Sequence, residues 1–126
     1  MNILRMHHAR FAVADLDRTE SFASDFGLVV ADKPRGRLFM RTRGPDAYSY
    51  VAELSPRAGF VGFALEVESA DDLDFATRTL GAVNRRPLDG PGGGEAVTLT
   101  DPDGVKIDLI AEVARRGAID SDAPDL

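Results

Sequence analysis

The sequence has no cysteine and no tryptophan, and its only two histidines are adjacent. The absence of cysteine excludes disulfides, thiolate metal sites and cysteine nucleophiles. No apolar run approaches the roughly 20 residues that span a bilayer, and the first residues lack the long apolar stretch of a secretory signal. We therefore expect a cytoplasmic protein that does not bind membranes.

Basic residues are outnumbered, because 15 Lys and Arg stand against 21 Asp and Glu. The deficit is confined to residues 61–126, which hold six basic and fourteen acidic side chains. A nucleic-acid-binding protein needs a basic face, so this balance argues against nucleic acid as a partner. Four arginines, Arg35, Arg37, Arg41 and Arg43, cluster on or beside one predicted hairpin, where we expect them to form a solvated face.

What the chain does contain is an internal repeat. The segment His8–Val13 recurs as Gly62–Val67, and Gly27 recurs as Gly81, each time 54 residues later. A repeat of this length indicates two copies of one supersecondary unit, each too small to bury its own apolar face. The two copies must then pack together, and we expect any chemistry to lie between them.

Each copy has the pattern β-α-β-β-β. Alternating apolar residues predict strands, and an acidic or serine cap followed by apolar residues at helical spacing predicts one helix per copy, closed by glycine. The sequence thus predicts an α+β domain over residues 1–113, made of modules 7–55 and 60–111. We expect residues 114–126 to form a flexible acidic tail.

Several motifs add a family resemblance to this pattern. They are Gly27–Val30, Tyr50–Glu53, Phe60–Phe63, Asp89–Gly94 and the turn Asp101–Gly104 before the last strand. With the paired modules, they resemble the vicinal oxygen chelate superfamily of glyoxalases, bleomycin-resistance proteins and extradiol dioxygenases, and most of all the N-terminal module of extradiol dioxygenases. The resemblance implies a cup-shaped mixed sheet, the glyoxalase-like fold. In extradiol dioxygenases it further implies that the C-terminal module holds the metal and the N-terminal module holds none.

Metal-using members of the superfamily place ligands on the first and last strands of each module. The resemblance transfers these four positions to His8, Glu53, Gly62 and Asp108. The repeat supports the transfer, because Glu53-Leu54 and Asp108-Leu109 match at an offset of 55 residues. Two further cup residues follow from strand alternation, since Arg10 shares a face with His8, and Lys106 shares one with Asp108.

We consider three interpretations of this cup, of which the first conflicts with the histidine pattern. A ring-cleaving iron centre needs two histidines and a carboxylate on one face, whereas His7 and His8 are expected to point to opposite faces of a strand. A divalent cation held by His8, Glu53 and Asp108, with water at the place of Gly62, is the metal alternative. The third interpretation has no metal, because Arg10 and Lys106 neutralise the two carboxylates.

We therefore predict a small-molecule-binding cup for an aromatic or hydrophobic ligand, with no cofactor and without a complete metal centre. The alternatives are a metal-dependent dioxygenase, isomerase or lyase of glyoxalase type, and an accessory subunit of a partner that carries the catalytic module. The glycine-rich segment 90–94 is expected to cover the cup mouth. The apolar run Phe60, Val61 and Phe63 predicts a homodimer, because such a run is costly to expose.

Overall fold

A computed structural model describes residues 1–115. The elements occur in the order β-α-β-β-β, twice. They are β1 (Ile3–Val13), α1 (Leu16–Asp25), β2 (Val29–Asp32), β3 (Arg37–Arg41), β4 (Tyr50–Leu54), β5 (Gly59–Val67), α2 (Ala70–Thr79), β6 (Val83–Pro87), β7 (Glu95–Thr100) and β8 (Lys106–Ala111). The predicted α+β fold of two paired modules is confirmed.

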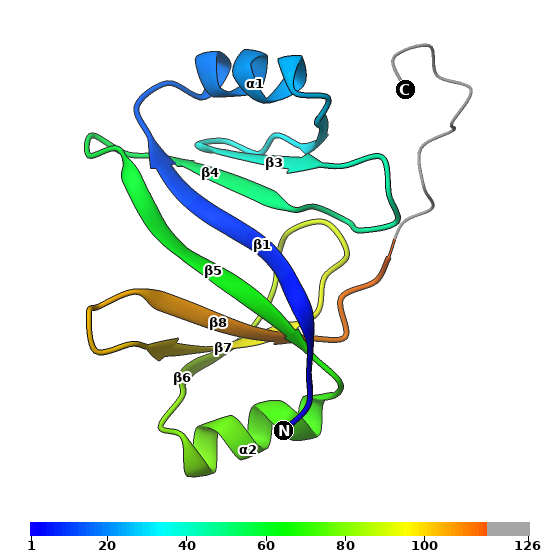
Figure 1. The fold of residues 1–126 in the computed structure, drawn as a ribbon, viewed down its shortest axis with the longest axis vertical. Coiled ribbons are helices and arrows are strands. Elements are labelled where there is room, and N and C mark those ends of the chain that lie inside the picture. The colour runs from blue at the N-terminus through cyan, green and yellow to red at the C-terminus, as the bar shows by residue number, and fades with distance from the viewer. Residues whose placement is uncertain (116–126) are drawn as a thin grey trace.

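All eight strands form one mixed sheet in the order β2-β3-β4-β1-β5-β8-β7-β6. The first strand of each module is parallel to the last strand of the same module, and β1 and β5 join the modules as an antiparallel pair at the centre. Figure 1 shows the sheet curving between the two modules, with α1 and α2 at opposite ends. From either edge inward, the strands are the second, third, fourth and first strand of one module. A pseudo-twofold axis between β1 and β5 therefore relates the two modules.

Each helix covers the outer face of its own module, and the two are covered unequally. In α2, Leu73 and Ala76 are fully buried against the sheet. In α1, Phe22 and Phe26 lie four residues apart and form an aromatic pair on one face of the helix, with ring centroids 4.8 Å apart. That face is nevertheless open to solvent, because Phe22 is 66% exposed and Phe26 is 74% exposed.

Local signals in the sequence explain where the helices begin and end. The carboxylate of Asp15 accepts a hydrogen bond from the backbone N–H of Arg18 (3.0 Å), and that of Asp72 accepts one from the N–H of Ser69 (3.3 Å). Gly27 and Gly81 have φ angles of 99° and 75°, which end each helix in the left-handed conformation. The glycines recur at the offset of the repeat, whereas the first turn is capped by the N-cap side chain in α1 and by the third helical residue in α2.

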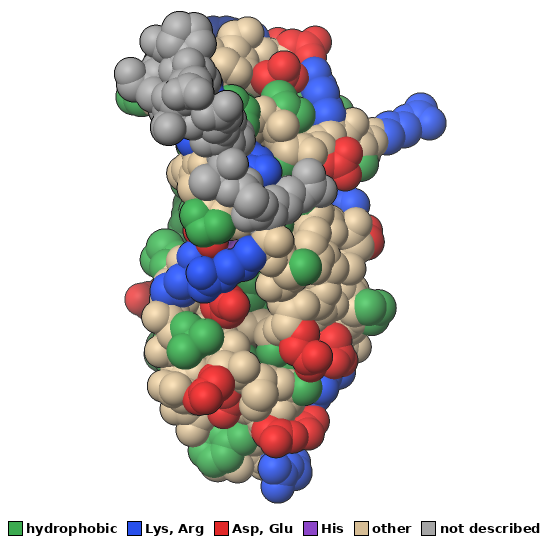
Figure 2. Space-filling view, turned by 90° about the vertical axis from the view of Figure 1, so that its right-hand side faces the viewer, with side chains coloured by type: hydrophobic (Ala, Val, Ile, Leu, Met, Phe, Trp, Pro, Cys, Tyr) green, Lys and Arg blue, Asp and Glu red, His purple; other side chains and the backbone are tan. Residues whose placement is uncertain are grey.

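The surface carries charges of both signs. Figure 2 shows basic and acidic side chains interspersed over the face that it presents, with no large area of one sign. Among residues 1–115, no helix is long and apolar enough to cross a membrane. Of the predicted tail 114–126, residues 116–126 lie outside the described residues. At its start, Ala114 donates a backbone hydrogen bond to the carbonyl of Gly92 (2.9 Å).

Candidate functional site

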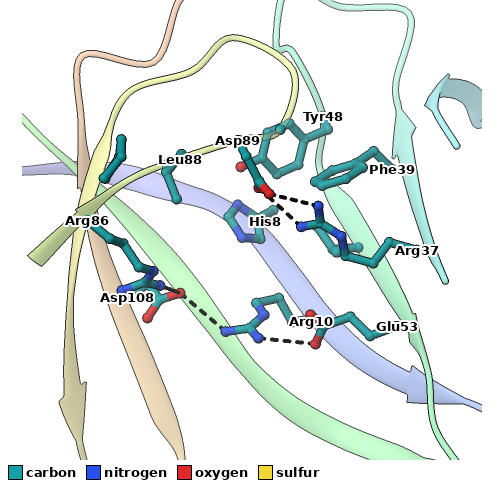
Figure 3. Close-up of a pocket in the computed structure, with 13 residues that line it drawn as sticks. His8, Arg10, Arg37, Phe39, Tyr48, Glu53, Arg86, Leu88, Asp89 and Asp108 are labelled. Atoms are coloured by element: carbon teal, nitrogen blue, oxygen red, sulfur yellow. Dashed lines mark hydrogen bonds and ion pairs between the residues drawn. The ribbon is translucent and has the colours of Figure 1, made fainter. Parts of the chain in front are cut away.

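A cavity of about 340 Å³ opens where the concave faces of the two modules meet. Strands β1, β3 and β4 of the first module and β6, β8 and the loop after β6 in the second supply its walls, as Figure 3 shows. The lining residues are His8, Arg10, Arg37, Phe39, Tyr48, Val51, Glu53, Arg86, Pro87, Leu88, Asp89, Gly90 and Asp108. The structure thus brings together four of the six residues predicted to line the cup: His8, Arg10, Glu53 and Asp108.

The floor of the cavity is a closed network of charges. The guanidinium of Arg10 bridges the modules, since it donates to Glu53 Oε1 (3.1 Å) and to Asp108 Oδ2 (3.3 Å). Asp108 also accepts from Arg86 (3.1 Å) and from the Thr98 hydroxyl (2.7 Å), and its side chain is only 5% exposed. Two arginines therefore balance two carboxylates, through charge-assisted hydrogen bonds.

A second ion pair lies at the rim. Arg37 of β3 donates to both oxygens of Asp89, at 3.2 and 3.0 Å, and so joins the first module to the loop after β6. Its guanidinium carbon also lies 5.2 Å from the centre of the Phe39 ring, a cation–π distance. The pairing holds the pKa of Asp89 below its usual value. The expected solvated arginine face is therefore wrong for Arg37, which lines the cup, and for Arg41, which is buried.

Aromatic rings form the remaining wall. The ring of Tyr48 lies 5.0 Å from that of Phe39 and 4.7 Å from that of His8, measured between centroids. All three side chains are buried. The cavity thus has an aromatic side from the first module that faces Leu88 and the loop of the second, as Figure 3 shows.

The two histidines are not separated by the sheet, contrary to the expected alternation. Met6 pairs with Leu65 and His8 with Ala64, so two steps along β1 match one step along β5. This bulge at His7 turns the rings toward one another, and their Nδ1 atoms are 2.9 Å apart. Only His8 lines the cavity, with His7 directly behind it. One Nδ1 must carry a hydrogen and the other must accept it, which fixes complementary tautomers.

Burial sets the protonation of these groups. Desolvation, with smaller contributions from His7 and Arg10, lowers the pKa of His8 to about 3. Burial likewise lowers the pKa of His7 and, with the nearby charge of Asp108, raises that of Tyr48 to about 12. At neutral pH the wall therefore presents a neutral imidazole and a neutral phenol, and all formal charge in the cavity belongs to arginines and carboxylates.

Two predicted cup residues lie elsewhere. Lys106 is exposed and donates to the hydroxyl of Thr100 (3.0 Å) instead of a carboxylate. Arg86, and not Lys106, is the cation that pairs with Asp108 in the second module. Gly62 is buried against the neighbouring strand, where a Cβ atom would overlap the carbonyl oxygen of Lys106. The backbone of the neighbouring strand therefore excludes a side chain at this position.

The strand register also changes which residues of the two modules correspond. If His8 is matched to Gly62, then Ala9 is matched to Phe63. Ala9 pairs with Tyr50, and Phe63 pairs with Ile107. The structural counterpart of Asp108 is therefore Val51, so the offset of 55 residues that related Glu53 to Asp108 does not describe the fold.

The proposed metal ligands do not fit an ion in this arrangement. His8, Glu53 and Asp108 all line the cavity, but the guanidinium of Arg10 occupies the space between the two carboxylates and bonds to both. Within the described part of the chain, no three His, Asp or Glu side chains form a group that could hold a metal ion. A cation at this position would have to displace Arg10.

Sequence reasoning missed several residues that define the cavity, among them Arg37, Phe39, Arg86 and Asp89. For Arg37 and Phe39 a signal existed, since both share alternation with Glu53 across the paired strands β3 and β4. Arg86 and Asp89 gave none, because a bulged edge strand and a glycine-rich loop have no fixed period. Tyr50 packs on the helix side of the sheet, against the core cluster that contains Ala23 of α1.

Comparisons with solved structures identify the same fold in larger proteins. The homoprotocatechuate 2,3-dioxygenase of Brevibacterium fuscum, in complex with 3,4-dihydroxyphenylacetate, is 26% identical with a TM-score of 0.82; the match covers 94% of this chain and 39% of that one. The 2,3-dioxygenase LapB of Pseudomonas sp. KL28 is 25% identical, with a TM-score of 0.80 and coverage of 93% and 43%.

A Mn(II)-bound glyoxalase from Novosphingobium aromaticivorans shares the fold at 20% identity, with a TM-score of 0.82 and coverage of 94% and 42%. The chain thus spans about two fifths of the length of these proteins. A search of curated proteins finds no match. The family model of the Glyoxalase/Bleomycin resistance protein/Dioxygenase superfamily matches residues 5–109, and with two β-α-β-β-β modules around one cup the chain belongs to this superfamily.

Proposed function

We propose that the cup binds a small organic molecule with an aromatic or apolar body, without metal-dependent catalysis. The observation that supports this is the cavity itself. Its volume of about 340 Å³ lies within the range of about 300–1,000 Å³ usual for ligand sites, and one wall consists of buried rings. Because its arginines are already paired with carboxylates, the cavity is neutral as a whole and does not need a metal ion to balance it.

Neutral aromatic probes test this directly. We expect benzamide and phenol to shift the NMR signals of Tyr48 and Leu88 in a saturable manner. Leu88→Trp should abolish these shifts, because the larger ring fills the cavity that Leu88 lines. Leu80→Trp is the matched control, since Leu80 is exposed at the end of α2. Saturable binding that Leu88→Trp leaves unchanged would place the ligand elsewhere and contradict the proposal.

A divalent-cation site at His8, Glu53 and Asp108 is the second candidate, favoured by the shared fold of the Mn(II)-bound glyoxalase. It requires that Arg10 leave the two carboxylates. Titration of Mn(II) into the protein and into Arg10→Met, followed by water-proton relaxation, separates the candidates. We expect no binding to the parent protein. Stoichiometric Mn(II) bound by the parent protein would establish the metal site. The accessory-subunit role, the cytoplasmic location and the homodimer stay predictions.

A further inference from the structure

The charged residues of the cavity fall into two sets that differ in how easily they can be opened. In the floor set, Asp108 is buried and accepts from three donors, so its removal from Arg10 and Arg86 would leave a carboxylate unpaired in a poorly solvated place. In the rim set, Asp89 is the one carboxylate within residues 1–115 that bonds to Arg37, and its side chain is 76% exposed. Asp89 can move into water at little cost.

The two members of the rim pair are also held differently. Arg37 projects from β3, a strand inside the sheet, and its guanidinium lies over the Phe39 ring. Asp89 is the second residue of the loop 88–94, which contains four glycines, three of them with positive φ. In Figure 3 the two side chains reach toward one another from opposite walls of the cup. If the pair opens, the arginine stays over the Phe39 ring in the cup, and the exposed Asp89 side chain turns into water.

The charge balance then sets the sign of the ligand. The lining residues include three arginines and three carboxylates, and His8 is neutral. Departure of Asp89 leaves one positive charge in excess, at Arg37, beside the aromatic wall. We infer that the cup selects a singly charged organic anion, a monocarboxylate with an aromatic or apolar body, whose carboxylate replaces Asp89 on Arg37. This inference rests on the proposed function and names the class of its ligand.

The decisive experiment compares two probes of the same shape and different charge, benzoate and benzamide, by NMR titration at fixed ionic strength. We expect the parent protein to bind benzoate at least about tenfold more tightly, because a two-point bond to guanidinium is charge-assisted. Arg37→Gln should remove this preference, so that the dissociation constants for benzoate and benzamide lie within about twofold of one another.

Asp89→Asn gives the most specific result, because it removes the competing carboxylate and keeps the loop. We expect it to tighten benzoate binding several-fold more than benzamide binding. Asp103→Asn makes the same charge change in the exposed turn between β7 and β8, and it should alter neither. Benzoate binding that is unchanged or weakened in Asp89→Asn would overturn the inference.

The outcomes separate this inference from the proposed function. Equal affinity of the parent protein for benzoate and benzamide, with both lost in Leu88→Trp, would leave the cup a ligand site and reject its selection by charge. Absence of binding for both probes would reject the proposed function and the inference together. Preference for benzoate that persists in Arg37→Gln would mean that another arginine receives the anion, and would also reject the inference.

Discussion

The two modules have the same strands and helix in the same order, yet they contribute different chemistry to the cup. The first module supplies the aromatic wall and the two arginines Arg10 and Arg37, whereas the second supplies Asp108, Arg86 and a loop that reaches across the mouth. The connections differ most: β3 and β4 are joined by residues 42–49, which carry Tyr48, and β7 and β8 by the short turn 101–105. Matching positions build the sheet, and unmatched ones build the site.

The comparison is sharpest for the two carboxylates that share Arg10. Asp108 is buried and accepts from three side chains, while the half-buried Glu53 pairs with Arg10 alone among the residues that the structure describes. Asp108→Ala should lower the free energy of unfolding by about 3 kcal/mol, because it removes a buried carboxylate that accepts three hydrogen bonds, two of them from arginines. Glu53→Ala should cost less than about 1 kcal/mol. Urea unfolding of both variants measures this, and equal losses would show that the modules hold their acids alike.

Gly62 occupies the position in the second module that corresponds to His8 in the first. Gly62→Ala should destabilise the protein by about 1–3 kcal/mol, because the added Cβ would overlap the backbone carbonyl of Lys106 on the adjacent strand. Gly59→Ala is the control, since no atom lies within 4 Å of a Cβ built there and its φ is not positive. If thermal unfolding finds Gly62→Ala as stable as the control, the absence of a side chain at this position is not imposed by packing.

Acid should act mainly through the first module, which contains both histidines. The pKa of His8 is about 6.5 in the unfolded chain and about 3 in the folded protein. Between these two pH values the unfolded state therefore binds a proton at His8 and the folded state does not. The free energy of unfolding should therefore decline as the pH falls from about 6.5 toward 3, by up to about 1.4 kcal/mol per pH unit for this group.

The variant His8→Asn, which does not titrate, tests the origin of this slope. Unfolding free energies measured between pH 7 and pH 4 should decline less steeply in His8→Asn than in the parent protein, whatever the stability of the variant at pH 7. Identical slopes would mean that His8 does not resist protonation and that other groups, such as His7, carry the acid sensitivity.

The sequence was sufficient for the fold because the repeat, the helix caps and the alternation of apolar residues all indicate the same architecture. It was sufficient for four cup residues, which lie on regular strands with a known face. It failed where regularity is broken: the bulge at His7 joins two rings that alternation separates, and the three-residue difference in register between the modules misplaces the counterpart of Asp108. Neither feature has a local sequence signal, because both depend on the partner strand.

The smallest effect on stability is expected at the seam between the modules, where β1 and β5 pair and Phe11 lies opposite Phe60. Phe60 of β5 meets Phe11 of β1 edge to face, with ring centroids 5.6 Å apart, and is still 53% exposed. Exposed rings are costly in water, so we expect two copies to associate here about a twofold axis, with about twice the chain mass of 13.6 kDa in light scattering at micromolar concentration. Phe60→Ser should return the mass to that of one chain and change the free energy of unfolding, measured on the monomer, by less than about 0.5 kcal/mol.

Phe22→Ser is the control for this prediction: it removes an exposed ring from α1 and should leave the dimer intact. A monomeric parent protein would show that the exposed seam does not drive self-association, and loss of the dimer in Phe22→Ser alone would move the interface from the seam to the helix of the first module.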